Sequence, residues 1–173
     1  MTRTESQSRS PGRPPVVVKI GGALVAKELS AFWRNIGMLK VRQPVVVVHG
    51  GGPEATRVAR ELGHEPEIVN GRRVTSERDM EIMLWVARGA LNTRLVGQAL
   101  ACGVRTVGLS GVDAGLVMVT RRPPWMIDGR EVDFGLVGDV QSVDVTVLEA
   151  LLAAGLTPVI GPLGVDENGQ AYN

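Results

Sequence analysis

Short apolar runs alternate along the chain with longer segments in which apolar residues recur every three or four positions. The short runs, several of them rich in valine, predict strands at about 15–19, 44–48, 105–109, 116–120, 125–133 and 157–160. The longer segments predict helices at about 24–38, 54–62, 76–101 and 143–154. Because strands and helices alternate, we expect an α/β fold, a three-layer αβα sandwich with a mainly parallel central sheet.

The stretch from Pro44 to Pro53 holds four consecutive valines, then a histidine, and then Gly50, Gly51 and Gly52. Valines without alternation predict a strand that is covered on both faces, as in a parallel sheet. Glycines lack a Cβ atom, so their backbone N–H groups can approach a ligand closely. A proline is well tolerated at the start of a helix. The stretch therefore predicts a strand, an anion-binding loop and a helix N-terminus.

A second valine run, 16–18, ends in Lys19 and is followed by Gly21 and Gly22. Ligands of parallel sheets collect at the carboxyl ends of the strands, and both glycine loops occupy such ends, as do Ser110 and Gly111. A lysine provides a mobile positive charge beside backbone donors, which suits a phosphoryl group in transfer. The two loops together indicate phosphoryl chemistry.

Asn70-Gly71 is a strong signal for a β-hairpin turn, and Arg72 and Arg73 follow it. Successive strand residues face opposite sides, so one arginine can face a ligand while the other, which we expect to be Arg72, faces water.

Ser76 is a good N-cap for the next helix. The middle of that helix, 82–87, is apolar on all sides and predicts burial on more than one side, for example against a two-fold partner subunit.

The chain has 173 residues, a net charge of +1 and only 3% aromatic residues, so we expect neither nucleic acid nor a membrane surface as its partner. The single cysteine, Cys102, excludes an internal disulfide and favours a cytoplasmic location. No apolar run approaches the ~20 residues of a membrane span, and no signal peptide is visible. Residues 1–14 are polar and rich in Ser, Arg, Gly and Pro, which predicts a disordered tail.

From about Val16 to the last residue, the chain resembles the N-acetylglutamate kinases of the amino acid kinase superfamily. The two glycine loops are common to the superfamily, whereas the Asn-Gly-Arg-Arg-Val-Thr hairpin at this distance from them is specific to the acetylglutamate enzymes. The resemblance rests on five segments in the family's order: Lys-Ile-Gly-Gly (19–22), His-Gly-Gly-Gly (49–52), Asn-Gly-Arg-Arg-Val-Thr (70–75), Gly-Leu-Ser-Gly-Val-Asp (108–113) and Ala-Tyr-Asn (171–173).

The resemblance implies transfer of the γ-phosphoryl group of ATP, bound with Mg²⁺, to the side-chain carboxylate of N-acetyl-L-glutamate in arginine synthesis. Lys19 matches the lysine that stabilises the transferring group, and Gly21 and Gly22 belong to its loop. Gly51 and Gly52 match the backbone contacts to substrate and phosphoryl group. Arg73 matches the arginine that holds the α-carboxylate, and Asn173 an asparagine that helps to bind the same substrate. No residue of this set is a metal ligand.

The family continues beyond the position of Asn173 with a nucleotide-binding half, which supplies a second phosphoryl-stabilising lysine and an organising aspartate. We therefore interpret residues 15–173 as the acyl-amino-acid-binding domain and expect this chain by itself to be at best a weak kinase. Arginine-inhibited hexamers of the family have an extra N-terminal helix. Residues 1–14 lack a helical pattern, so we expect a homodimer.

Three other functions stay open. The spacing of Gly50, Gly52 and Ala55 matches a relaxed dinucleotide fingerprint, although no acidic residue ends the following strand. A related kinase could act on another acyl amino acid, such as carrier-linked aminoadipate in lysine synthesis. A non-catalytic ligand-binding module is the third alternative.

We expect His49 to position its loop, whereas Asp113 either caps a turn or takes part in catalysis.

Overall fold

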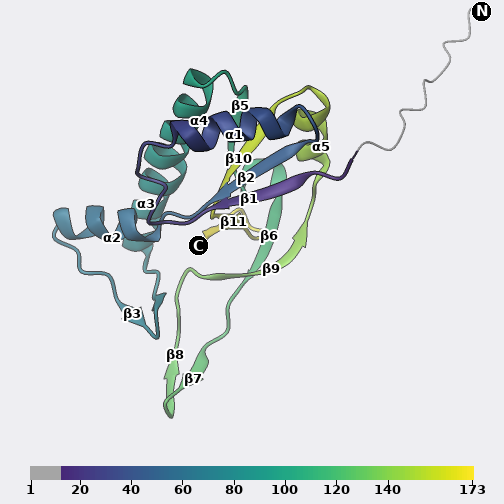
Figure 1. Cartoon of the computed structure of the whole chain (residues 1–173). Helices are drawn as coiled ribbons and strands as arrows, with labels where there is room; N and C mark the ends of the chain where they lie inside the picture. Colours follow the sequence, from purple (N-terminus) through teal and green to yellow (C-terminus); the bar gives the residue numbers. More distant parts are fainter. Residues whose placement is uncertain (1–12) are drawn as a thin grey trace, which may run out of the picture.

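The computed structural model describes residues 13–173, and its centre is a four-stranded sheet in the order β1-β2-β10-β5 (Figure 1). All neighbours in this sheet are parallel. Its strands are β1 (Val16–Ile20), β2 (Val45–His49), β10 (Thr157–Gly161) and β5 (Thr106–Ser110). The expected α/β fold with a mainly parallel central sheet is thus confirmed.

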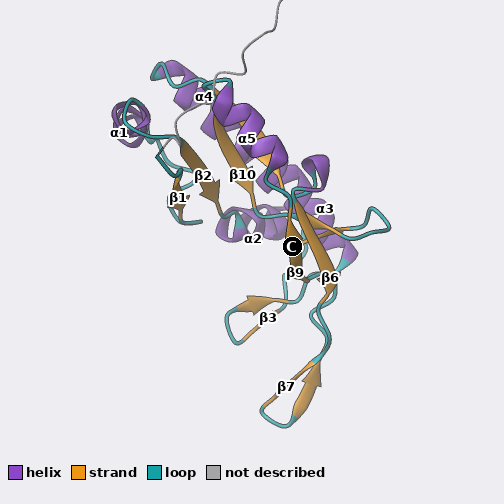
Figure 2. Ribbon diagram, turned by 90° about the vertical axis from the view of Figure 1, so that its right-hand side faces the viewer, coloured by secondary structure: helices purple, strands orange, loops and turns teal. Residues whose placement is uncertain are grey.

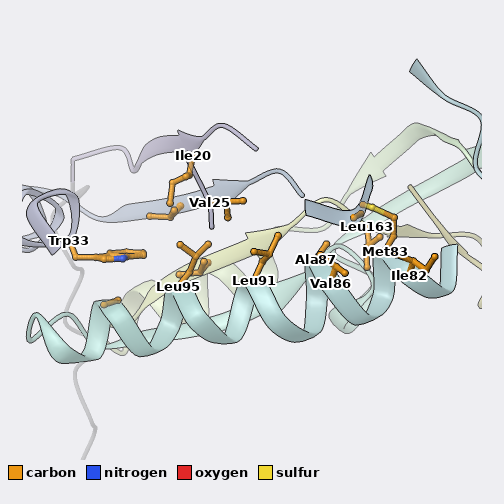
Figure 3. Close-up of a cluster of buried hydrophobic side chains, with 14 of the residues drawn as sticks. Ile20, Val25, Trp33, Ile82, Met83, Val86, Ala87, Leu91, Leu95 and Leu163 are labelled. Carbon is orange, nitrogen blue, oxygen red and sulfur yellow. The ribbon is translucent and has the colours of Figure 1, made fainter. Parts of the chain in front are cut away.

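The helical elements are α1 (Ser30–Lys40), α2 (Gly52–Glu61), α3 (Glu77–Met83), the π-helical segment η1 (Leu84–Leu91), α4 (Asn92–Ala101), the short 3₁₀ turn η2 (Asp113–Gly115) and α5 (Thr146–Ala153). The elements from α1 to α4 enclose the main core against the sheet, whereas α5 contacts β10 and adds no residue to this core. Figure 3 shows Leu91 and Leu95 projecting from the long helix toward Val25 and Ile20. Trp33 of α1 closes one end of this core and is fully buried.

A second, mixed sheet has the order β12-β11-β6-β9, and two hairpins extend from the body. The strands of this sheet are β6 (Val117–Arg121), β9 (Gly138–Val143), β11 (Gly164–Val165) and β12 (Ala171–Tyr172). The hairpins are β3 (Ile68–Val69) with β4 (Arg72–Arg73), and β7 (Trp125–Ile127) with β8 (Arg130–Val132). Figure 2 shows both hairpins projecting on the same side of the molecule. The turn expected at Asn70-Gly71 is confirmed by positive φ angles, and Asp128-Gly129 forms the turn of the second hairpin with positive φ angles as well.

The first helix begins later than the sequence pattern predicts. We expected residues 24–38 to be helical, but α1 spans Ser30–Lys40 and the chain before it turns irregularly. The side chain of Gln98 on α4 holds this turn, since its Oε1 accepts from the Leu29 N–H (3.2 Å) and its Nε2 donates to the Lys27 carbonyl (3.0 Å). These contacts with a distant helix override the local helical spacing.

The helix predicted at 76–101 is confirmed, with a π-helical middle, whereas the helix predicted at 143–154 needs correction. In the first segment Leu84 and Trp85 are 38% and 51% exposed in the single chain, so burial of 82–87 against a partner subunit stays a prediction. In the second, Val143 ends β9 and pairs with Val117 in an antiparallel ladder, so that α5 starts only at Thr146. The antiparallel pairing with β6 involves residues far away in sequence, which local periodicity cannot detect.

Within residues 13–173, no helix combines the length and the apolar composition that crossing a membrane requires. The expected tail at 1–14 lies almost entirely outside the described residues.

Candidate functional site

The two glycine loops lie against each other at the carboxyl end of the parallel sheet. Ile20 and His49 are in register at the ends of β1 and β2, and the Gly50 N–H donates to the Ile20 carbonyl at 3.2 Å. A Cβ on Gly50 would lie 3.4 Å from the Gly22 nitrogen, so the backbones pack closely. The topology thus confirms that neighbouring strands bring the two loops together.

Gly51 and Gly52 have different surroundings. A Cβ on Gly51 would lie 3.0 Å from the Ala87 Cβ of η1, so packing against the π-helical segment requires a glycine. A Cβ on Gly52 would meet nothing within 4 Å. Gly52 begins α2, whose first turn leaves backbone N–H groups without intrahelical partners. These donors, with the positive end of the helix dipole, favour an anion in the space beside Gly52.

A cavity of about 440 Å³ opens at this helix end. It brings together Gly51, Gly52, Arg73 and Asn173, four of the residues predicted for the site. Its lining comes from both glycine-rich and distant segments: Gly50, Gly51, Gly52, Pro53, Thr56, Ile68, Gly71, Arg73, Met83, Pro162 and Asn173. The lining is therefore largely apolar, and Arg73, Thr56 and Asn173 supply its polar side chains.

Arg73 is the charged group of the cavity, and its side chain is only 7% exposed. Its Nη1 lies 3.1 Å from Oδ1 of Asp79, while its Nη2 donates to the Gly52 carbonyl at 3.2 Å and to the Thr56 hydroxyl. These contacts fix the guanidinium against α2. The planar group has five N–H donors, so it can still present donors to a carboxylate in the cavity.

Asp79 balances the charge of Arg73 from beneath the cavity. Its carboxylate accepts from the Ser76 N–H (3.2 Å) and hydroxyl (2.6 Å), and its Oδ1 lies 3.1 Å from His64 Nε2. Burial by itself raises the pKa of Asp79, but the hydrogen bonds from Ser76, His64 and Arg73 outweigh it and hold the pKa below its ordinary value. Asp79 is therefore a stable anion that orients the guanidinium of Arg73.

His49 supports the glycine loop from below, as expected from the sequence. Its Nδ1 lies 2.8 Å from the Gly50 carbonyl, which can only accept, so Nδ1 carries the proton. Its Nε2 is then free to accept from the Asn92 amide at 3.0 Å. Burial lowers the pKa of His49, although the bond to Gly50 opposes this shift, and the ring is neutral at pH 7. A neutral ring is not placed to shuttle protons in the cavity.

The structure places three predicted residues outside the cavity lining. Gly21 is exposed, and Gly22 packs so tightly that its Cβ would lie 2.8 Å from Cδ of Pro53. Lys19 is exposed near the end of β1, in register with Val48. Strand alternation puts it on the face opposite to Ile20, which belongs to the main core.

Several residues of the site were missed at the level of sequence. Thr56 lies one helical turn after Gly52, a spacing that could have indicated it. Pro162 directly follows β10, where strand-end reasoning also applies. Asp79 lies three residues after the predicted N-cap Ser76, a spacing that indicates a helix cap rather than a site, and no sequence signal pointed to Asn92. Asp113 accepts from the Ser110 N–H (2.6 Å) and hydroxyl (2.9 Å), so it caps a turn.

Comparisons with known proteins identify relatives of the chain. The chain is 41% identical to the acetylglutamate kinase of Methanopyrus kandleri over 157 residues, covering 91% of this chain and 61% of the relative. It is 46% identical to the acetylglutamate kinase of Symbiobacterium thermophilum over 162 residues, covering 91% of this chain and 55% of the relative. The chain thus spans less than two thirds of the length of these curated relatives.

Solved structures share the same fold. The structure of smu.665 from Streptococcus mutans matches with a TM-score of 0.79 and 25% identity, covering 92% of this chain and 62% of that one. N-acetylglutamate synthase from Neisseria gonorrhoeae, complexed with coenzyme A and N-acetyl-glutamate, matches with a TM-score of 0.73 and 26% identity, covering 92% and 36% respectively. The model of the amino acid kinase family matches residues 14–173. The chain belongs to the amino acid kinase family.

Proposed function

We propose that this chain binds N-acetyl-L-glutamate and presents its side-chain carboxylate for phosphorylation by ATP. The observation that carries the proposal is the pairing of two anion-binding groups at one cavity, the buried guanidinium of Arg73 and the helix start at Gly52. The substrate is a dianion whose carboxylates are separated by a short carbon chain. One cavity that combines two neighbouring anion-binding groups with apolar walls suits such a molecule.

In this proposal Arg73 binds the α-carboxylate, because a forked guanidinium matches a carboxylate in geometry and charge. Asn173 holds the substrate from the opposite side of the cavity and is itself fixed, since its N–H donates to the Leu136 carbonyl at 3.0 Å. The N–H groups around Gly51 and Gly52 receive the side-chain carboxylate and the incoming phosphoryl oxygens. The carboxylate oxygen attacks phosphorus, its new bond replaces the bond to ADP, and no protein nucleophile is required.

Lys19, with the loop of Gly21 and Gly22, is assigned to the transferring phosphoryl group, whose charge a mobile lysine can follow. ATP is the proposed co-substrate. Among residues 13–173, no three His, Cys, Asp or Glu side chains group together to hold a metal ion, so Mg²⁺ would enter bound to the ATP phosphates. The nucleotide-binding residues are proposed to lie in the part of the relatives that this chain does not span.

Calorimetric titration with N-acetyl-L-glutamate tests the substrate assignment. We expect saturable binding that is lost in Arg73→Ala, because the variant removes the partner of one carboxylate. Arg130→Ala is the matched control, since this arginine is exposed on β8 outside the cavity lining. Absence of binding to a folded wild-type chain, or equal binding by Arg73→Ala, would contradict the assignment.

Three alternatives can be distinguished by titrating other ligands and by adding ATP. An N-acylated 2-aminoadipate, one methylene longer, would bind more tightly than N-acetyl-L-glutamate if the chain served lysine synthesis. A non-catalytic module would bind the acyl amino acid but give no acyl phosphate when ATP is added. Binding of NAD would instead favour the dinucleotide alternative. The Asn70-Gly71 hairpin, which carries Arg73 into the cavity, favours acetylglutamate.

A cytoplasmic homodimer remains part of the proposal. The exposed side chains of Leu84 and Trp85 on η1 offer an apolar surface for a two-fold contact. Light scattering of the purified chain tests it, because a dimer built on this surface would dissociate in Trp85→Glu, whereas a monomeric wild type would contradict it.

A further inference from the structure

The indole ring of Trp125 connects the two hairpins that project from the body (Figures 1 and 2). The guanidinium carbon of Arg72, on β4, lies 5.0 Å from the centroid of this ring, and that of Arg122 lies 4.6 Å from it. Arg72 was expected to be solvated, and its side chain is indeed exposed. Its position over an aromatic ring nevertheless makes it a contact between segments that are far apart in sequence.

Trp125 is itself held firmly to the body. Its ring makes an edge-to-face contact with the buried Phe134, with a centroid distance of 5.6 Å. The neighbouring Arg122 is fixed by Asp139, whose Oδ1 accepts from Nε at 2.8 Å and from Nη2 at 2.6 Å. The Thr75 N–H donates to the Phe134 carbonyl at 2.9 Å, which joins the base of the first hairpin to the same region. The ring is therefore a rigid anchor.

The hairpin of β3 and β4 has little support of its own. Each strand is only two residues long, and an isolated two-stranded hairpin is marginally stable in water. Yet this hairpin supplies Ile68, Gly71 and Arg73 to the cavity wall. Arg72 and Arg73 are adjacent and face opposite sides of the strand, so a contact that fixes Arg72 outside also fixes Arg73 inside.

We propose that Arg72 and Trp125 form a latch that holds the β3–β4 hairpin against the body and thereby positions Arg73 in the cavity. Both are positioning residues, because they touch neither the cavity nor, in the proposed function, the substrate. This proposal rests on the proposed function only for the identity of the ligand. The contact between Arg72 and Trp125, and its effect on the hairpin, concern the ligand-free protein.

The first experiment measures amide hydrogen exchange of the ligand-free chain at Val74, whose N–H donates to the Glu67 carbonyl across the hairpin at 2.9 Å. We expect Arg72→Gln and Trp125→Leu each to speed exchange about two- to fivefold, the range of one exposed cation–π contact. In the double variant, the Val74 amide should exchange no faster than it does in the more affected of the two single variants. Arg72→Lys and Trp125→Phe should restore slow exchange, because they keep a cation and a ring.

Arg130→Gln is the matched control, since it removes the same charge from the neighbouring hairpin. Unchanged Val74 exchange in both latch variants, or equal acceleration in the control, would overturn the proposal.

The second experiment measures the Kd for N-acetyl-L-glutamate by calorimetry in the same variants. We expect a two- to fivefold weaker Kd in Arg72→Gln and Trp125→Leu, with recovery in the conservative variants. If the Val74 amide exchanges faster in these variants while the Kd stays at the wild-type value, the positioning role of the latch is overturned. If the wild-type chain binds no N-acetyl-L-glutamate, the proposed function fails, and the exchange experiment alone decides whether the latch exists.

Discussion

Replacement of Asn92 by leucine tests how the glycine loops are supported. Asn92 begins α4 and is 1% exposed. Its Nδ2 lies 2.9 Å from the Val159 carbonyl, 3.3 Å from the Leu109 carbonyl and 3.0 Å from Nε2 of His49. One amide thus connects the carboxyl ends of three strands beneath the candidate site. Leucine has a similar volume, so the variant removes donors without opening a large cavity.

The expected loss of stability follows from the acceptors that the variant leaves behind. A buried acceptor without a donor costs about 1 to 3 kcal/mol. The three contacts share a single amide and are not additive, and we therefore expect Asn92→Leu to lower the free energy of unfolding by about 2 to 4 kcal/mol. His49 would lose the partner that fixes its ring, so the Gly50 carbonyl and the loop above it should also become more mobile.

Urea unfolding followed by circular dichroism measures this loss, because the midpoint reports stability when the slope is unchanged. The matched control is Asn35→Leu, an exposed position on α1 where the same substitution should change stability by no more than about 0.5 kcal/mol. Equal stabilities of the two variants would refute the reasoning, since Asn92 would then contribute no more than a surface amide.

Three further predictions address the site and its surroundings. Asp79→Asn should lower the free energy of unfolding by about 1 to 3 kcal/mol at pH 5. Because the folded-state pKa of Asp79 lies below its ordinary value, this difference should shrink as the pH falls below about 4, which urea unfolding at several pH values measures. Gly111→Ala should lower the free energy of unfolding by about 2 to 3 kcal/mol, because its Cβ would overlap the Leu163 carbonyl oxygen. The control Gly97→Ala on α4, where a Cβ meets nothing within 4 Å, should be neutral or slightly stabilising, and thermal unfolding measures both variants. Gly52→Ala should leave the melting temperature unchanged but weaken binding of N-acetyl-L-glutamate about tenfold by calorimetry, and unaltered affinity would place the anion elsewhere.

The sequence by itself determined the parts of this protein that depend on local chemistry. Valine runs that end in glycines predicted β1 and β2 with their loops, because backbone approach and burial on both faces require those residue types. Asn70-Gly71 predicted the hairpin that carries Arg73, because its turn requires positive φ angles. The rule that ligands collect at strand ends predicted that the loop of Gly51 and Gly52 belongs to a site, and these residues line one cavity with Arg73.

Only the tertiary structure decided how these parts are held. Asn92 and His49 are 43 positions apart in the chain, and Asn173 donates toward Thr75 across 98 positions at 3.4 Å. Arg72 contacts Trp125 across two separate hairpins. Such contacts arise from the packing of strands and helices that local periodicity treats separately, so no pattern within a short window encodes them. The site's chemistry is therefore visible in its motifs, whereas its support lies in single residues that only the folded chain brings together.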